Sequence, residues 1–65
     1  MKSEFGRKIE KLQAIQGMST GELAKKIGLS ITNVSQMKRS KRPRPVTIHR
    51  IAKAFDVDVD LFLSE

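Results

Sequence analysis

Apolar residues recur at helical spacing along this chain, and short polar or glycine-containing segments separate the apolar stretches. The first predicted helix covers about 4–16 and ends at Gly17. Gly6 lies inside it and weakens its first turn by ~1 kcal/mol relative to alanine. The helix follows Ser3, and its expected apolar stripe consists of Phe5, Ile9, Leu12 and Ile15.

Two further helices are predicted close together in the next twenty residues. Ser19 and Glu22 have the spacing of a capping box, in which each side chain binds a free backbone amide at the start of a helix. That helix is expected over about 20–27, with an exit through a positive φ at Gly28. Ser30 caps a third helix only three or four residues later. So short a joint forces the two helices to cross steeply, as in a helix-turn-helix.

The remainder of the chain predicts a basic loop, a fourth helix and a short fifth one. Two prolines in the segment Lys38–Pro45 exclude a helix interior there. The fourth helix is expected at roughly 46–55, and Asp58 caps a fifth element at about 59–63. The apolar positions of the fourth helix are Val46, Ile48, Ile51, Ala52 and Phe55. With no strand pattern, repeat or linker, the fold class expected for residues 1–65 is one all-α domain of five short helices.

Composition narrows the function. The 65 residues contain no Cys and one His, so a disulfide framework and a thiolate zinc site are excluded. His49 and scattered carboxylates offer no nucleophile–base pair and no metal-ligand cluster. We therefore expect no enzyme, no catalytic or metal-binding residue, no cofactor and no small-molecule ligand. No apolar run is long enough for a signal peptide or a membrane span, which favours a cytoplasmic protein.

The formal charge of +6 is unevenly distributed along the chain. Residues 1–55 hold all 13 Lys and Arg and three acids, a charge of +10, whereas residues 56–65 carry −4. Five cations fall within the seven residues 38–44: Lys38, Arg39, Lys41, Arg42 and Arg44. Such a density suits a polyanion, with nucleic acid first and an anionic membrane surface second. From charge alone, a solvated face that keeps a small protein soluble is equally compatible.

The segment 20–39 combines the features that a right-angled helix pair requires. Ala24 is small where a larger residue would push the next helix away, Gly28 makes the turn, and Val34 faces Ala24. The other inward positions are Leu23, Ile27, Leu29 and Met37.

With these residues, the sequence resembles the phage Cro/repressor type of helix-turn-helix domain, the XRE-like family, over almost its whole length. "GMSTGELAKKIGLSITNVSQM" is similar to the family's segment from its second helix through its recognition helix, and "IHRIAKAFDVDVDLFL" resembles its fourth helix and final apolar turn. The resemblance implies a lambda-repressor-like fold with a central helix-turn-helix. It also implies sequence-specific binding of double-stranded DNA, usually by a dimer that regulates transcription.

The chain departs from the family pattern at three places. Thr20 stands where the family often has Gln, the pair Met37-Lys38 where it has Trp-Glu or Leu-Glu, and Ser40 where it has Gly. These changes affect a side-chain contact to phosphate, the local charge and the turn after the third helix. None of them alters the core pattern.

Helical geometry and the resemblance together select the residues expected to contact DNA. With Val34 inward, Thr32, Gln36 and Arg39 point outward, flanked by Asn33 and Ser35. The base-reading candidates are Ile31, Thr32, Ser35 and Gln36. The phosphate candidates are Thr20, Asn33, Arg39, Lys41, Arg42 and Arg44.

Ile31 has two possible roles at this stage. The resemblance places it at a base-reading position that often carries Gln, where an isoleucine could pack only on a thymine methyl group. Its helical angle, however, lies nearer Val34 than Thr32, so it could equally fold back on the core.

The C-terminal segment is more apolar than one short turn can bury. Some of Val57, Val59, Leu61, Phe62 and Leu63 should close the core, and some should form a homodimer contact. These features predict a bacterial or phage-encoded repressor, associated with the nucleoid, that binds a two-fold symmetric operator as a homodimer. The alternative is an antitoxin-like module that binds a protein partner through the apolar tail, with DNA binding secondary. An amphipathic membrane-surface peptide is disfavoured because the apolar faces of these short helices are needed for the core.

Overall fold

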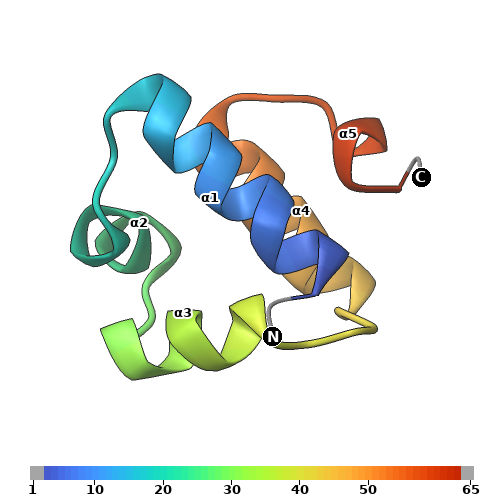
Figure 1. Ribbon diagram of the computed structural model, residues 1–65, viewed down its shortest axis with the longest axis horizontal. Helices are drawn as coiled ribbons and strands as arrows, with labels where there is room; N and C mark the ends of the chain where they lie inside the picture. The colour runs from blue at the N-terminus through green and yellow to red at the C-terminus, as the bar shows by residue number, and fades with distance from the viewer. Residues whose placement is uncertain (1–2, 64–65) are drawn as a thin grey trace.

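A computed structural model describes residues 3–63 and arranges them as five α-helices without strands (Figure 1). The predicted all-α class and the number of helices are confirmed for this part of the chain. The fourth helix begins one residue earlier than predicted, and the fifth one residue later. The helices are α1 (Glu4–Gln16), α2 (Thr20–Ile27), α3 (Ile31–Lys38), α4 (Pro45–Phe55) and α5 (Asp60–Leu63).

Serine side chains cap the first three helices. Ser3 accepts a hydrogen bond from the Gly6 amide at 3.2 Å, and Ser30 accepts one from the Asn33 amide at 3.2 Å. At α2 the capping box is complete, because the Ser19 hydroxyl binds the Glu22 amide and the Glu22 carboxylate binds the Ser19 amide. The sequence signals for these helix starts are therefore confirmed.

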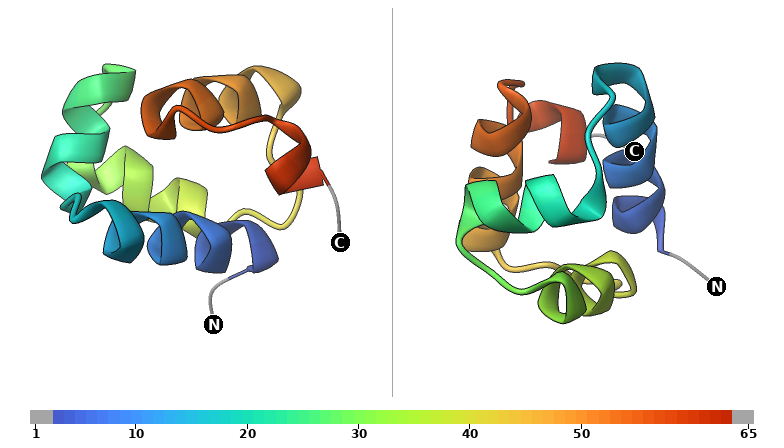
Figure 2. Two further views of the ribbon diagram at one scale, coloured as in Figure 1. Left: turned by 90° about the horizontal axis from the view of Figure 1, so that it is seen from above. Right: turned by 90° about the vertical axis from the view of Figure 1, so that its left-hand side faces the viewer.

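The turn between α2 and α3 has the form that the glycine predicts. Gly28 adopts φ 73°, and the Leu29 amide donates to the Ala24 carbonyl at 2.9 Å, which closes the end of α2. Ala24 is 3% exposed and Val34 is fully buried, so the two helices pack closely at this small residue. In Figure 1 and in the right view of Figure 2, α3 lies along the lower edge of the molecule, and no other helix covers its outer side.

The core lies between α1, α4 and the helix pair α2–α3. Its buried members are Phe5, Ile9, Leu23, Ala24, Ile27, Val34, Ile48, Ile51 and Phe55. Two further contacts connect distant parts of the chain. The Gln16 side-chain amide donates to the Phe55 carbonyl at 2.8 Å, and the rings of Phe5 and Phe62 meet edge to face at 5.6 Å. They attach the end of α1 to α4, and α5 to the start of α1.

Two residues assigned to apolar stripes are exposed in the structure. Ile15 is 69% exposed because it lies about 120° around α1 from Ile9, at 100° per residue. Gln13, four residues after Ile9, takes the inward position instead and is 8% exposed. Val46 is 57% exposed because two residues of helix place it nearly opposite the buried Ile48. These two expectations from apolar spacing were wrong.

Gly6 is where α1 approaches the end of α3. A Cβ atom on Gly6 would overlap the carbonyl oxygen of Lys38 and would lie 2.9 Å from its carbonyl carbon. The Ser3 hydroxyl donates to the same Lys38 oxygen at 2.9 Å. The glycine that weakens α1 as an isolated helix thus permits a contact between helices that a side chain would prevent.

We therefore expect Gly6→Ala to lower the free energy of unfolding by about 2 kcal/mol, because the new methyl group must displace backbone rather than a flexible side chain. Gly21→Ala is the matched control, since its nearest neighbour is Cδ1 of Ile31 at an ordinary 3.6 Å. That change should raise stability by about 0.5–1 kcal/mol through helix propensity. Urea unfolding followed by circular dichroism measures both, and a shift of the same sign in the two variants would contradict the proposed contact.

Candidate nucleic-acid interface

The outer face of α3 consists of polar side chains in solvent. Val34 is fully buried on the inner side, and Ile31, Thr32, Asn33, Ser35, Gln36 and Arg39 are all exposed. The Ser30 cap and the compact turn at Gly28 fix the start of this helix, while Val34 anchors its middle in the core. The four predicted base-reading residues therefore lie on one exposed helix.

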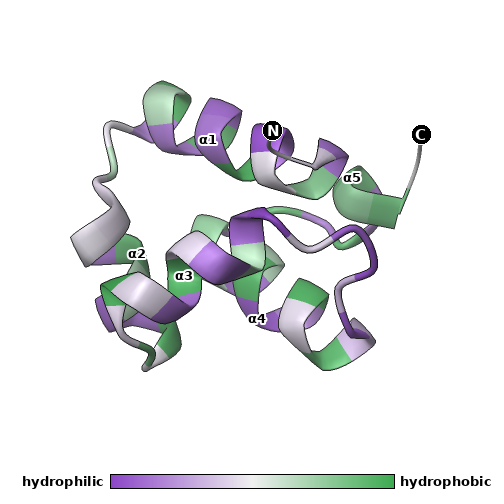
Figure 3. Ribbon diagram, turned by 60° about the horizontal axis from the view of Figure 1, so that its bottom comes forward, coloured by the Kyte–Doolittle hydropathy of each residue, from purple (hydrophilic) through white to green (hydrophobic). Residues whose placement is uncertain are grey.

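A basic loop borders the C-terminal end of α3. Its residues Lys41, Arg42 and Arg44 are exposed, as is Arg39 at the end of the helix. Figure 3 shows the hydrophilic colour continuing from α3 along this loop to the start of α4. A cleft of about 710 Å³ opens between the loop and α3 and is lined by Asn33, Gln36, Met37, Ser40, Arg42, Pro43, Arg44 and Thr47. It brings one predicted base reader next to three predicted phosphate ligands.

Thr20 is the first residue of α2 and contacts both α1 and the end of α3. Its hydroxyl oxygen accepts hydrogen bonds from Nε2 of Gln13 at 3.3 Å and from Nζ of Lys38 at 3.2 Å. A hydroxyl group has two acceptor positions and one hydrogen to donate. With both acceptor positions filled from inside the protein, the hydroxyl hydrogen is what Thr20 has left for a further hydrogen bond.

Lys38 does not belong to the exposed basic run in which the sequence placed it. It is the last residue of α3 and is 6% exposed, and its ammonium lies 3.6 Å from the Glu10 carboxylate. Because Lys38 follows Val34 by four residues, it lies on the inward face of α3. The same spacing relates Gln13 to the buried Ile9. Four exposed cations of the predicted five thus remain available in 38–44.

Ile31 is not part of the core. Its side chain is 57% exposed, and its Cδ1 atom lies 3.6 Å from the position of a Cβ on Gly21. The option that Ile31 folds back among the buried residues is therefore excluded, and its contact with a base stays a prediction.

Residues 3–63 were compared with the requirements of a metal site and of a membrane-spanning helix. Within that range no three His, Cys, Asp or Glu side chains are grouped closely enough to hold a metal ion. Nor does any described helix combine the length and apolar character needed to cross a membrane.

Comparisons with known proteins agree with this geometry. Residues 8–62 match the family of Cro/C1-type HTH DNA-binding domains. The chain belongs to this family. Among solved structures, the restriction-modification controller protein C.AhdI from Aeromonas hydrophila is similar, with a TM-score of 0.78 and 29% sequence identity over 89% of each chain. No match was found among curated proteins.

Membership of the Cro/C1-type family confirms the resemblance read from the sequence and its helix-turn-helix. It makes this protein a DNA-binding transcription regulator, a class whose members are not normally enzymes. The family match does not test the individual DNA contacts assigned above, so these contacts stay predictions.

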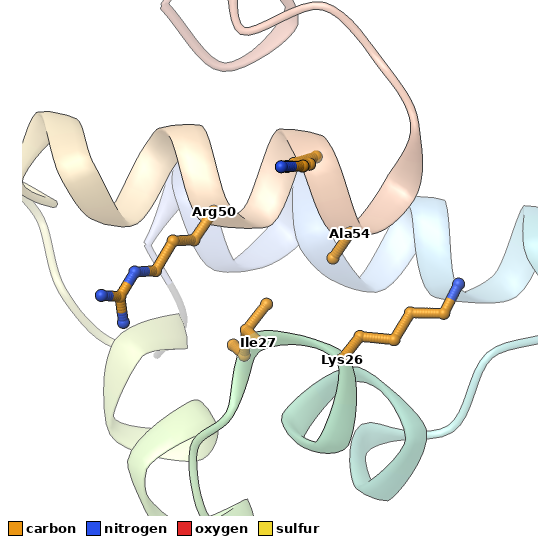
Figure 4. Close-up of a pocket in the computed structure, with 5 residues that line it drawn as sticks. Lys26, Ile27, Arg50 and Ala54 are labelled. Carbon is orange, nitrogen blue, oxygen red and sulfur yellow. The ribbon is translucent and has the colours of Figure 1, made fainter.

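A second basic hollow in this Cro/C1-type domain was missed by the sequence analysis. It lies between α2 and α4, has a volume of about 380 Å³, and is lined by Lys26, Ile27, Arg50, Lys53 and Ala54 (Figure 4). Lys26 lies 24 residues before Arg50 in the sequence, so no local run of charge joins it to Arg50 and Lys53. In Figure 4 the side chain of Arg50 extends from α4 toward the side on which α3 lies. These cations add to the positive field of the whole domain.

The buried Lys38 and the exposed Lys41 should differ in their effect on stability when each is replaced by alanine. Lys38→Ala removes a buried stem and the hydrogen bond to Thr20, so we expect the free energy of unfolding to fall by about 2 kcal/mol. Lys41→Ala, at an exposed position, should change stability by less than about 0.5 kcal/mol.

In DNA binding we expect the larger effect from Lys41→Ala and the smaller one from Lys38→Ala. Lys41→Ala should flatten the dependence of log affinity on log salt by about one unit, whereas Lys38→Ala should leave that slope unchanged. Chemical unfolding and salt titrations of DNA binding measure the two properties. A lower salt slope for Lys38→Ala would show that its ammonium reaches phosphate after all.

Proposed function

We propose that this protein represses transcription by binding a two-fold symmetric operator in double-stranded DNA as a homodimer. The observation that carries the proposal is the exposed polar face of α3, held over the buried Val34 and bordered by four exposed cations. A helix presented in this way can enter the major groove, which is wide enough to admit it. The matched family and the similar controller protein support the same reading.

Base recognition is assigned to the outward side chains of α3. Gln36 can form two hydrogen bonds with an adenine edge, and Thr32 can offer a hydroxyl to a base or a methyl to thymine. Ser35 is exposed at the flank of this face. Side chains of this chemistry select sequence, since they address base edges rather than the backbone.

Phosphate binding is assigned to the two flanks of α3. On one flank the cleft side chains Asn33, Arg42 and Arg44 adjoin Gln36, with Arg39 and Lys41 exposed nearby. On the other, the hydroxyl hydrogen of Thr20 is free to donate, because Gln13 and Lys38 already bind its oxygen. Contacts on both flanks would fix the orientation of the helix in the groove.

The homodimer is assigned to the C-terminal apolar segment. Val57, Val59 and Phe62 pack against the core, but Leu61 is 45% exposed and Leu63 is 61% exposed. Figure 3 shows α5 as mainly hydrophobic, and in Figure 1 it lies at the upper right of the molecule while α3 lies along the lower edge. A seam there would leave both recognition helices free, about 34 Å apart on successive turns of DNA.

Restriction and modification genes are one candidate target. The printed description of C.AhdI as a restriction-modification controller protein favours this context, given the similarity over 89% of each chain. A regulator of this kind acts where bacterial DNA lies, in the cytoplasm.

Selection of binding sites from a random duplex DNA pool at ~0.15 M salt tests the proposal. The expected result is a two-fold symmetric motif with half-sites about ten base pairs apart. DNA retained without any enriched motif would contradict sequence-specific recognition, and an enriched single half-site would contradict the dimer.

Substitutions of base-reading and of phosphate-binding residues should have different effects on binding to the selected site. Gln36→Ala should reduce the preference for that site over random DNA by ~1–3 kcal/mol. Arg42→Ala should weaken binding to both DNAs alike and flatten the salt slope by about one unit. Competition titrations at several salt concentrations measure both effects, and equal losses on both DNAs for both variants would refute this division of roles.

The proposed dimer contact of the C-terminal apolar segment is tested by the double change Leu61→Ser and Leu63→Ser, which leaves Phe62 in place. We expect it to shift the protein toward monomer in sedimentation experiments and to lower affinity for the full operator at least tenfold. Val46→Ser is the matched control, because Val46 is exposed and apolar but lies outside the C-terminal segment. An unchanged monomer–dimer equilibrium in the double variant would place the seam elsewhere.

A further inference from the structure

Ile31 is an exposed apolar residue at the start of a polar recognition face. It is the first residue of α3 and is 57% exposed, and the exposed side chains that follow it, Thr32 and Asn33, are polar. Its Cδ1 atom lies beside Gly21 of α2, 3.6 Å from the position that a Cβ on Gly21 would take. Ile31 thus lies where α2 and α3 meet, with one side next to Gly21 and the rest of its side chain in solvent.

The chemistry of the major groove limits what such a side chain can recognise. Every base edge there presents at least one hydrogen-bond donor or acceptor, and the one methyl group is the C5 methyl of thymine. An isoleucine has no hydrogen-bonding group, so it gains nothing from the edges of guanine, adenine or unmodified cytosine. 5-Methylcytosine carries a methyl group on the same ring atom as thymine.

We propose that Ile31 is a 5-methylpyrimidine contact, through which this protein distinguishes thymine from uracil and 5-methylcytosine from cytosine at one position of each half-site. The proposal rests on the proposed function, since it assumes that α3 enters the major groove. It adds that the protein responds to cytosine methylation at that position. Burial of one methyl group against Ile31 predicts about a fourfold change in affinity for each half-site.

The test uses the operator obtained by selection from random DNA. Each thymine of one half-site is replaced in turn by uracil, and affinities are measured for the wild type and for Ile31→Ala. We expect one thymine position at which the wild type loses about fourfold and Ile31→Ala loses nothing. A thymine that contacts the Thr32 methyl would affect both proteins alike. At that same position, a 5-methylcytosine–guanine pair should bind the wild type about fourfold better than a cytosine–guanine pair, and the variant should not discriminate between them.

Ile15→Ala is the matched control, because Ile15 is an isoleucine with 69% exposure on α1. It should keep the full sensitivity to uracil, and thermal unfolding should show both alanine variants folded. Equal sensitivity of the wild type and Ile31→Ala at every thymine, or insensitivity of the wild type throughout, overturns the proposal. Failure of the proposed function itself would be seen earlier and separately, as the absence of any selected motif.

Discussion

The arrangement of the DNA-binding face depends on the junction at which α1, α2 and α3 meet around Lys38. At this point Gly6 admits the backbone of α3, Ser3 donates to the Lys38 carbonyl, and the ammonium of Lys38 reaches Glu10 and Thr20. Apolar packing at Val34 sets which side of α3 faces the core. Directional hydrogen bonds at Lys38 add a second restraint at the end of the helix.

The sequence predicts most of this fold because its signals are local. Serine caps, a capping box and two terminating glycines mark the helix ends within a residue, and each rests on an interaction between neighbours in the chain. The predictions for Ile15 and Val46 were wrong because they followed apolar character and not the angular position of each residue around its helix. For the same reason Gln13 and Lys38, polar residues at inward angles, were overlooked. Their burial depends on partners from other helices, which no local pattern reveals.

The candidate site also has one part that the sequence predicts and one part that only the structure shows. The outward face of α3 follows from Val34 and a rotation of 100° per residue, so its exposed residues could be chosen from sequence. Whether Ile31 points to the core or to solvent depends on Gly21 in another helix and on the space already filled by Val34, so only the structure decides it. The hollow formed by Lys26, Arg50 and Lys53 is likewise a tertiary feature. Local charge density overstates the basic loop by one lysine and misses these three cations.

The size of the molecule constrains how the proposed dimer can work. A stable interface usually buries about 800 Å² on each partner, and the whole surface of this chain is 4754 Å². Leu61 and Leu63 provide a much smaller apolar area than that, since Val57, Val59 and Phe62 are largely used inside the chain. A seam limited to these two leucines would be weak, so the free protein would dimerise only at the high concentrations of a sedimentation experiment. One subunit bound to DNA would raise the local concentration of the second. On this argument the proposed operator would help to assemble the proposed dimer, and at low protein concentration DNA binding should rise steeply with concentration.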